Sequence, residues 1–285
     1  MTVRYTLDAQ GVATLSLTQP VALHDVMQVL EQAVNDESVQ GILLLASTGD
    51  FVTDEVKFAA SNNAASNNTA ANNAALGKAA VLFAKTEERH RSLRKLENCG
   101  KPLAIALSLG AAGLSLELAM VAHHRVAADI AVAEFCMSEI GSGRMPGLGG
   151  TQRLPRLIGI QNALSMLLEN KKLHAAEALA LNLVDALVPA GAEANEARLW
   201  LLSKLVQASI VQQPWDRKGY KIPGGAVASP AMQQLFMLSN AMLRAKNRAS
   251  EKAAVNTLSS VYEGLITDID TGLKTEARYF VNAVI

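Results

Sequence analysis

Two short runs of uninterrupted apolar residues constrain the fold of this chain more than any other feature. Residues 41–46 read GILLLA and residues 103–107 read LAIAL, and segments with helical patterns separate such runs. A strand with one face in water alternates apolar and polar residues, so a continuous run of this length indicates a strand that is buried on both faces. The pattern therefore predicts an α/β fold, in which helices cover a mainly parallel sheet.

The rest of the chain supplies further strands and helices by the same criteria. Residues 3–17 predict two strands around a turn at Gln10 and Gly11. Helical spacing of apolar residues continues through most of the remaining chain, with a break expected at 155–159, where Pro155 and Gly159 interrupt the pattern. The other predicted strands are 124–128, 131–135 and 183–188, and the predicted helices are 21–35, 75–98, 113–121, 151–169, 175–181, 194–209 and 231–285.

Two segments differ from this pattern. Residues 59–75, AASNNAASNNTAANNAA, repeat a five-residue unit without charge or large apolar side chains, so we predict a flexible surface loop. Residues 212–230 are rich in turn-forming residues and predict a connector. We therefore divide the chain into a core at 1–190 and a helical C-terminal region at 191–285. The charged half of the predicted helix 75–98 is interpreted as a solvated face.

Charge and composition exclude several classes of protein. Lys and Arg number 26, as do Asp and Glu, which argues against binding of nucleic acid through phosphate neutralisation. Two cysteines, Cys99 and Cys136, cannot form a disulfide framework, and their spacing does not predict a metal site. The first residues lack the basic and apolar regions of a signal peptide, and no apolar run reaches the roughly 18 residues of a membrane span. We expect a cytoplasmic protein.

Familiar nucleotide and hydrolase motifs are absent from the sequence. Gly147, Gly149 and Gly150 precede the helical segment TQRLPRLIG, an arrangement typical of an anion-binding helix start. It is not a dinucleotide fingerprint, because GxGxxG would require glycine at the position of Gln152. No GxxxxGK[ST] loop or GxSxG elbow is present. We therefore expect neither NAD binding nor serine-hydrolase chemistry.

Two glutamates are the strongest candidates for chemistry. Glu117 lies within the apolar stretch LSLELAMVA, and Glu139 lies within the glycine-rich stretch SEIGSGRMPGLGG. If the two carboxyl groups meet at one pocket, they can act on one water as base and acid. The alternative for Glu117 is a buried ion pair, for instance with Arg125, and Glu139 taken alone is a surface acid. The adjacent His123 and His124 are interpreted as buried or satisfied side chains rather than catalytic ones.

The segment 101–159 carries a resemblance to a known family. It reads KPLAIALSLGAAGLSLELAMVAHHRVAADIAVAEFCMSEIGSGRMPGLGGTQRLPRLIG, and it resembles the signature region of the crotonase (enoyl-CoA hydratase/isomerase) superfamily. ELAMVAHHRVA and PGLGGTQRLPRLIG are its most specific strings. The tail segments QPWDRKGYKIPGG and VYEGLITDIDTGLKTEARYF resemble the stretch that follows the hydratase part of multifunctional fatty acid β-oxidation α-chains. The resemblance thus implies the hydratase part of such a protein, without the 3-hydroxyacyl-CoA dehydrogenase domain that follows in those chains.

This resemblance implies a fold, a reaction and a set of residues. The fold is a spiral of ββα units with a helical C-terminal region, and the reaction adds water to 2,3-trans-enoyl-CoA, with Δ3-Δ2-enoyl-CoA isomerase activity as an addition. Glu117 is implied to position and activate the water, and Glu139 to exchange a proton at the α-carbon. Backbone N–H groups of Glu55 and Leu114 are implied to form the oxyanion hole.

Gly113, Pro146 and Gly147 are implied to shape the substrate pocket. No metal or redox cofactor is implied, since the substrate itself carries coenzyme A. Family members form trimers or hexamers, whereas the multifunctional α-chains associate with a thiolase subunit.

Two motifs depart from the family pattern, and both concern the oxyanion hole. The first usually reads F-x-x-G-A-D, whereas residues 51–56 read FVTDEV and place Asp54 at the glycine. The second usually reads N-G-x-A-x-G-G-G, whereas residues 108–115 read SLGAAGLS and place Leu114 at a glycine. We expect Leu114 to narrow the acyl site and the acids at 54 and 55 to bring negative charge near a developing oxyanion.

Three functions are compatible with these observations. The first is an enoyl-CoA hydratase, for which both glutamates are retained. The second is another reaction of the same fold on acyl-CoA, in which Glu139 alone moves a proton. The third is a weakly active or inactive domain that binds acyl-CoA or a partner subunit, which the departures in the oxyanion motifs favour.

Overall fold

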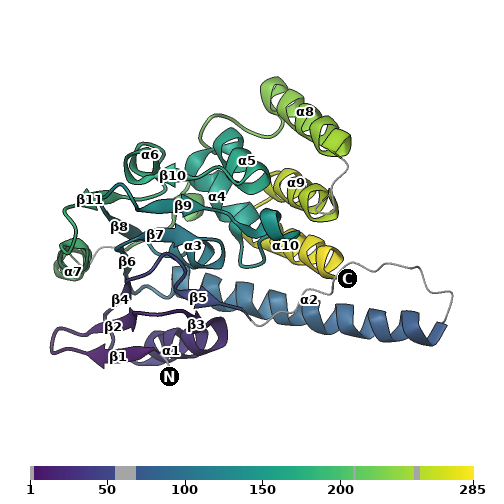
Figure 1. Cartoon of the computed structure of the whole chain (residues 1–285). Helices are drawn as coiled ribbons and strands as arrows, with labels where there is room; N and C mark the ends of the chain where they lie inside the picture. The colour runs from purple at the N-terminus through teal and green to yellow at the C-terminus, as the bar shows by residue number, and fades with distance from the viewer. Residues whose placement is uncertain (1–2, 55–68, 208–209, 247–250) are drawn as a thin grey trace.

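The computed structural model describes residues 3–54, 69–207, 210–246 and 251–285. Its main sheet has six strands in the order β1-β2-β4-β6-β8-β11. The β1–β2 pair is antiparallel and the other neighbours are parallel, which confirms the predicted α/β class (Figure 1). The strands are β1 (Arg4–Leu7), β2 (Val12–Leu17), β4 (Gly41–Ala46), β6 (Leu103–Leu107), β8 (His124–Ala128) and β11 (Ala186–Val188).

Short strands follow the long ones and give the chain a repeating ββα order. The unit recurs as β2-β3-α1, β4-β5-α2 and β6-β7-α3, and β8-β9 is followed by the 3₁₀ helix η1 and then α4. This is the spiral that the resemblance implies. The added elements are β3 (Val21–Ala22), α1 (Leu23–Asn35), β5 (Val52–Thr53), α2 (Thr69–Asn98), β7 (Gly110–Ala112), α3 (Leu114–Ala119), β9 (Glu134–Cys136), η1 (Glu139–Ser142) and α4 (Gly150–Ile158).

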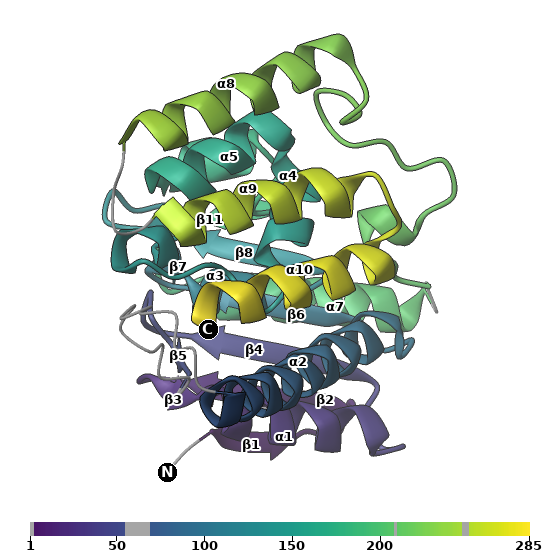
Figure 2. The same cartoon turned by 90° about the vertical axis from the view of Figure 1, so that its right-hand side faces the viewer.

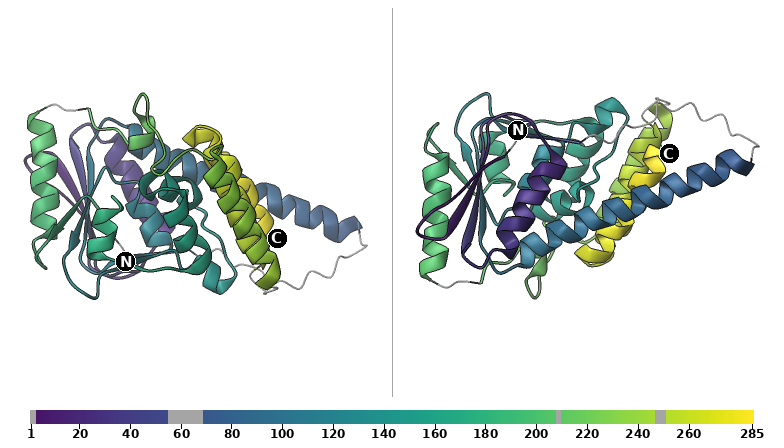
Figure 3. Two further views of the ribbon diagram at one scale, coloured as in Figure 1. Left: turned by 90° about the horizontal axis from the view of Figure 1, so that it is seen from above. Right: turned by 90° about the horizontal axis from the view of Figure 1, so that it is seen from below.

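The apolar strands are buried on both faces, as predicted. On β4, Ile42 and Leu44 belong to the large hydrophobic core on one side of the sheet, whereas Leu43 belongs to a smaller core on the other side. Helix α7 (Glu193–Val206) closes that second side and contributes Ala197 and Leu201 to the smaller core. Figure 3 shows α7 on one face of the sheet and the other helices on the opposite face. Strands β4 and β6 have the bounds that the apolar runs predicted.

The C-terminal half consists largely of helices that stack beside the spiral. α9 and α10 lie side by side, and α10 also contacts α2 and α4 (Figure 2). Gly159, with a φ of +83°, separates α4 from α5 at the predicted break. The remaining elements are α5 (Ile160–Glu169), β10 (Leu173–His174), α6 (Ala175–Ala180), the 3₁₀ helix η2 (Pro214–Asp216), α8 (Pro230–Lys246), α9 (Glu251–Leu265) and α10 (Ile269–Val284).

The prediction of a loop over residues 59–75 is wrong for its last seven residues. Residues 69–75 belong to α2, which begins six residues before the predicted helix at 75, because the alanines that alternate with asparagine there are strong helix formers. Residues 59–68 lie outside the described residues. The division of the chain at residue 190 stays a prediction.

The charged half of α2 is only in part the solvated face that we expected: Lys85, Glu88, Arg91 and Lys95 are exposed, but other charged side chains are not. His90 and Glu97 are buried, and Glu97 lies 2.6 Å from Arg94 and 2.7 Å from Arg153 of α4. Arg94 also pairs with Asp216 and Asp270. Because α10 and α4 cover this face of α2, its charges form a buried network of ion pairs. The projecting first half of α2 is visible in Figure 1.

Membrane-spanning and metal-binding features are both missing from the described residues. Within the described ranges, no helix combines the length and the apolar character that a membrane span requires. In the same part of the chain, no group of three or more His, Cys, Asp or Glu side chains is arranged to hold a metal ion.

Candidate active site

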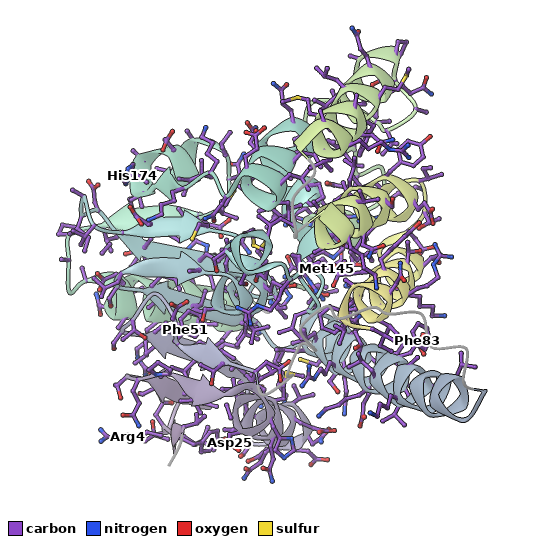
Figure 4. The ribbon with its side chains drawn as sticks, turned by 45° about the vertical axis from the view of Figure 1, so that its right-hand side comes forward. Arg4, Asp25, Phe51, Phe83, Met145 and His174 are labelled. Carbon is purple, nitrogen blue, oxygen red and sulfur yellow. The ribbon has the colours of Figure 1, made fainter. Side chains whose placement is uncertain are left out.

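A cavity of about 490 Å³ opens between the strands of the spiral and the C-terminal helices. Its walls come from β5, α2, α3, the segment 138–148 and α10, so residues distant in the sequence meet there. Figure 4 shows Phe51 among the strands and Met145, one of the lining residues, next to the C-terminal helices. The lining residues are Pro20, Asp50, Val52, Thr53, Asp54, Arg89, Ala112, Gly113, Leu114, Glu117, Ser138, Glu139, Arg144, Met145, Gly147, Leu148 and Phe280.

Glu117 reaches the cavity from α3 and is held by backbone donors. Its side chain is buried, with a residue exposure of 1%. Oε2 accepts hydrogen bonds from the N–H groups of Leu148 at 2.8 Å and Gly150 at 2.7 Å, and Oε1 accepts a longer one from Gly147 at 3.3 Å. The carboxyl group is therefore fixed in one orientation toward the cavity.

The alternative ion pair of Glu117 with Arg125 is wrong. Arg125 instead pairs with Asp185, at 2.9 Å, and donates to the carbonyl oxygen of Leu183. Both partners of Arg125 come from the segment before β11, which pairs with β8 and so brings them next to this arginine.

The turn that holds Glu117 is the glycine-rich segment 147–151, where α4 begins. All five of its N–H groups donate to carboxylates: those of 147, 148 and 150 to Glu117, and those of 149 and 151 to Glu276 of α10. Gly149 makes this possible with a φ of +100°, a conformation that favours glycine. The expected anion-binding helix start thus binds two of the protein's own carboxylates.

Glu139 enters the same cavity from η1. A methyl group on Gly113 would lie 2.9 Å from Oε1 of Glu139, so the glycine, with its φ of +51°, leaves the room that this side chain occupies. Its Oε2 is shielded from solvent and has no hydrogen-bond partner among the described residues. Glu117 and Glu139 therefore come from separate elements and line one cavity, as two carboxyl groups acting on one water require.

Burial and repulsion by nearby carboxylates raise the pKa of both glutamates. The pKa of Glu117 lies well above its usual value, first because of burial and then because Glu276 and Glu139 are close. Burial raises the pKa of Glu139 to about 7, against the lowering influence of Arg144. A pair with such pKa values holds at least one proton near neutral pH, and carboxyl groups poised in this way are suited to general acid–base catalysis.

Glu276 and Phe280, both on α10, belong to this site and were missed in the sequence. Glu276 is fully buried, and its Oε2 also accepts from the Thr151 hydroxyl at 2.6 Å. A signal was present, because Glu276 falls on the apolar stripe of a helix whose other buried side chains are Ile269, Leu273, Ala277 and Phe280. A carboxylate on such a stripe requires buried donors.

The oxyanion-hole residues are only partly described. Glu55 lies outside the described residues. Leu114 is the first residue of α3, where the helix supplies no acceptor for the backbone N–H, and it lines the cavity beside Gly113. Its side chain is partly buried against the core.

A serine replaces the last glycine of the family's second oxyanion motif, and its hydroxyl has a structural role. The Ser115 side chain accepts hydrogen bonds from the N–H groups of Phe51 at 2.9 Å and Val52 at 3.0 Å. Ser115 is fully buried. It therefore ties the segment that carries the first oxyanion motif to the helix that carries the second.

The charge of Asp54 is compensated, which corrects the expectation for this residue. Arg89 of α2 donates two hydrogen bonds to its carboxylate, at 2.7 and 2.9 Å. Both side chains line the cavity and are largely buried, with side-chain exposures of 13% and 20%. Asp54 thus brings a neutral ion pair to the cavity rather than an isolated negative charge.

Of the three pocket residues implied by the resemblance, two line the cavity and one does not. Gly113 and Gly147 line the cavity, and a methyl group on Gly147 would lie 2.6 Å from the ring of Phe280. Pro146 is buried next to Gly150 and is not one of the lining residues.

The two histidines have structural partners away from the cavity. The Nδ1 atom of His123 accepts from the N–H of Leu103, and its Nε2 lies 2.9 Å from the carbonyl oxygen of Glu97. His124 stacks on Trp200 at 4.6 Å. The interpretation of His123 as a satisfied side chain is confirmed, whereas His124 is held by stacking.

Comparison with known proteins places this geometry in a family. The model of the enoyl-CoA hydratase/isomerase family matches residues 9–214. The glyoxysomal fatty acid beta-oxidation multifunctional protein MFP-a of Cucumis sativus is 34% identical over 184 residues, which are 65% of this chain and 24% of that protein. The fatty acid oxidation complex subunit alpha of Shewanella baltica is 26% identical over 285 residues, 98% of this chain and 37% of the subunit. The matched part of the chain thus spans 24% to 37% of the length of these relatives.

Solved structures agree on the fold. An enoyl-CoA hydratase from Mycobacterium avium subsp. paratuberculosis is similar over 99% of this chain and 97% of its own, with a TM-score of 0.59 and 17% identity. An enoyl-CoA hydratase/isomerase from Mycobacterium abscessus is similar over 89% of this chain and 95% of its own, with a TM-score of 0.55 and 22% identity. With the family model matched over most of its length, this chain belongs to the enoyl-CoA hydratase/isomerase family.

Proposed function

We propose that this chain is an enoyl-CoA hydratase that adds water to 2,3-trans-enoyl-CoA thioesters. The observation that supports this most strongly is the pair Glu117 and Glu139, which line one cavity from separate elements. The names of the relatives support fatty acid β-oxidation as its setting. The cavity, at about 490 Å³, falls within the usual range for small-molecule sites.

In the proposed reaction the two carboxyl groups have complementary roles. Glu117, held in place by the turn 147–151, positions the water and takes one of its protons while the water oxygen bonds to the β-carbon. Glu139 supplies a proton to the α-carbon, so one water is added in total. The pKa of Glu139, at about 7, leaves this group protonated in a large share of molecules at neutral pH.

Negative charge develops on the thioester oxygen as the β-carbon is attacked. The N–H of Leu114, at the start of α3, is the described donor that we assign to this oxygen. A preorganised donor of this kind contributes roughly 3–4 kcal/mol to lowering a barrier. Ser115 anchors the segment 51–52 next to α3. The assignment of the second donor to the N–H of Glu55 stays a prediction from the resemblance, since Glu55 lies outside the described residues.

Isomerase activity is a natural addition to this proposal. Moving a double bond between the Δ3 and Δ2 positions requires a proton to leave one carbon and return to another, which one carboxyl group can accomplish. We assign that role to Glu139, since its Oε2 has no hydrogen-bond partner among the described residues and is therefore available.

The proposal is tested by an assay with a panel of enoyl-CoA thioesters of increasing chain length. We expect loss of the conjugated thioester absorbance for at least part of the panel, with formation of the 3-hydroxyacyl-CoA. Absence of hydration across the panel, combined with saturable binding of acyl-CoA, would support a binding domain instead.

A weakly active binding domain is the second candidate, because Leu114 lines the cavity where the family has glycine. Restoring glycine at positions 54 and 114 and alanine at 55 separates the two. A large gain in hydration rate would show that these side chains weaken the native site. An unchanged rate in an active enzyme would show that the backbone suffices.

The remaining expectations stay predictions. They are the cytoplasmic location, the independence from a metal or redox cofactor, and association either as a homo-oligomer or with a thiolase subunit.

A further inference from the structure

We propose that Glu276 of α10 is a positioning residue of this site, a third carboxylate that fixes the turn 147–151 from behind and governs the pH response of the Glu117 and Glu139 pair. The proposal rests on the proposed function where it concerns catalysis. Its geometric part concerns the turn alone and is independent of which reaction the site performs.

The geometry makes Glu276 a counterpart of Glu117. The N–H groups of the turn alternate between the two carboxylates, so that each residue of the turn is fixed by one of them. Glu276 accepts from Gly149 at 2.6 Å and from Thr151 at 2.9 Å, the two N–H groups that Glu117 does not use. If Glu276 is removed, these donors are left buried and unsatisfied, and the turn loses the contacts that hold its other three donors toward Glu117.

The carboxylate is held on its remaining sides as well. Its Oε2 accepts from the Thr151 hydroxyl, which lies 2.7 Å from the hydroxyl of Ser260 on α9. On the side of α2, Nε2 of His90 lies 3.3 Å from Oε1 of Glu276 and 3.1 Å from the carbonyl oxygen of Gly147. With its proton on Nε2, His90 donates to both and ties Glu276 to the residue that lines the cavity.

Charged side chains on neighbouring elements surround the Glu276 carboxyl group, in addition to its hydrogen-bond donors. The charged groups that face it are His90 on α2, the Arg153 guanidinium on α4, and the two glutamates of the cavity. Arg153 lies against Gly149 and pairs at 2.7 Å with Glu97, which also pairs with Arg94. On α9, the carboxylate of Glu263 pairs with Arg278 of α10.

The charge of Glu276 therefore acts on the catalytic pair. It raises the pKa of Glu117 and of Glu139 by repulsion, in addition to the effect of burial. A hydratase needs one protonated and one ionised carboxyl group in its resting state. A third, non-reacting carboxylate nearby favours retention of a proton by the pair at neutral pH, and α10 supplies it.

The experiment follows the ionisation of Glu117 without relying on activity. In protein labelled with nitrogen-15 glycine, the amide signals of Gly147 and Gly150 report the charge of the carboxylate to which they donate, and a pH titration gives its midpoint. The variants are Glu276→Gln, Glu276→Asp and, as a matched change of one charge on the exposed face of α10, Arg278→Gln.

We expect Glu276→Gln to lower the midpoint by roughly 1 unit, because a nearby negative charge is removed. Glu276→Asp keeps the negative charge but shortens the side chain by one methylene, which places the charge farther from Glu117. The midpoint of the Glu117 titration should therefore fall by only about 0.3 unit. Arg278→Gln should leave the midpoint unchanged. In an active enzyme, the limbs of the pH profile of kcat/KM should move in the same direction.

An unchanged midpoint in folded Glu276→Gln would overturn the proposal and leave Glu276 a structural residue only. If Glu276→Gln does not fold, Glu276→Asp decides, and an unchanged midpoint together with an unmoved Gly149 signal would overturn it. If the wild-type protein hydrates no enoyl-CoA, the proposed function fails, whereas the titration still decides the role of Glu276.

Discussion

The two walls of the cavity hold their backbone segments in place by different kinds of contact. The turn wall, residues 147–151 with Glu117, keeps the residue pattern of its family, and each of its N–H groups donates to a carboxylate. The strand wall, residues 51–54 with 113–115, departs from that pattern at several positions. There, side chains make the contacts: Ser115 accepts hydrogen bonds from the N–H groups of Phe51 and Val52, and Arg89 pairs with Asp54.

This difference shows which requirements of the site depend on residue type. The turn wall needs glycine, since Gly149 has a positive φ and a methyl group on Gly150 would lie 2.8 Å from Oε2 of Glu117. The strand wall contributes main-chain donors, whose positions other contacts can fix. A change on the turn wall should therefore cost more than a comparable change on the strand wall.

The largest effect should come from the glutamates themselves. Glu139→Gln and Glu117→Gln should each lower the hydration rate by about 10²- to 10⁴-fold, because each removes a group that transfers a proton. Steady-state kinetics on purified variants measure this, with Glu263→Gln on the exposed face of α9 as control. Full activity in either variant would refute its assignment.

On the strand wall, the largest effect is predicted for Ser115→Ala. The variant leaves the N–H groups of Phe51 and Val52 buried without an acceptor, so the free energy of unfolding should fall by roughly 2–4 kcal/mol. Chemical denaturation measures the loss, and Ser203→Ala on α7 is a surface control. A hydration rate that stays at the wild-type level would show that Ser115 does not hold the oxyanion segment.

Glu139 lies between the walls, and its protonation should appear in the stability of the protein. Its pKa is raised in the folded state to about 7, so folding favours the protonated form. The resulting stabilisation is complete below the ordinary pKa of about 4.5 and is lost as the pH rises through 7. The free energy of unfolding should fall over this window by roughly 1–3 kcal/mol more in the wild type than in Glu139→Gln. Equal slopes in denaturation series at several pH values would contradict this.

The smallest effect concerns the Asp54–Arg89 pair. Arg89→Gln leaves Asp54 unpaired beside the cavity and should lower kcat/KM about 3- to 10-fold, whereas the double variant with Asp54→Asn should recover most of the loss, since partly exposed pairs contribute on the order of 1 kcal/mol. A double-mutant cycle measures the coupling. Additive losses would show that the two side chains act independently.

Local patterns in the sequence were sufficient for the parts of the fold that depend on burial. The runs at 41–46 and 103–107 became strands with those bounds, because only a strand inside a covered sheet buries both faces of such a run. Glu117 and Glu139 were found from their setting and from the resemblance. Glu276 and Ser115 were not, because their roles depend on partners 125 and 64 residues away, which meet them only in the folded chain. For the same reason His90 and Glu97 were taken for surface residues.

The central claim, that Glu117 and Glu139 together add water to an enoyl thioester, is tested most directly by mass spectrometry of the product formed in water labelled with heavy oxygen. The claim predicts one labelled oxygen on the 3-hydroxyacyl-CoA made by the wild type. It also predicts loss of that labelled product in both Glu117→Gln and Glu139→Gln. Turnover that moves the double bond without taking up labelled oxygen, or labelled product formed at the wild-type rate by either variant, would contradict it.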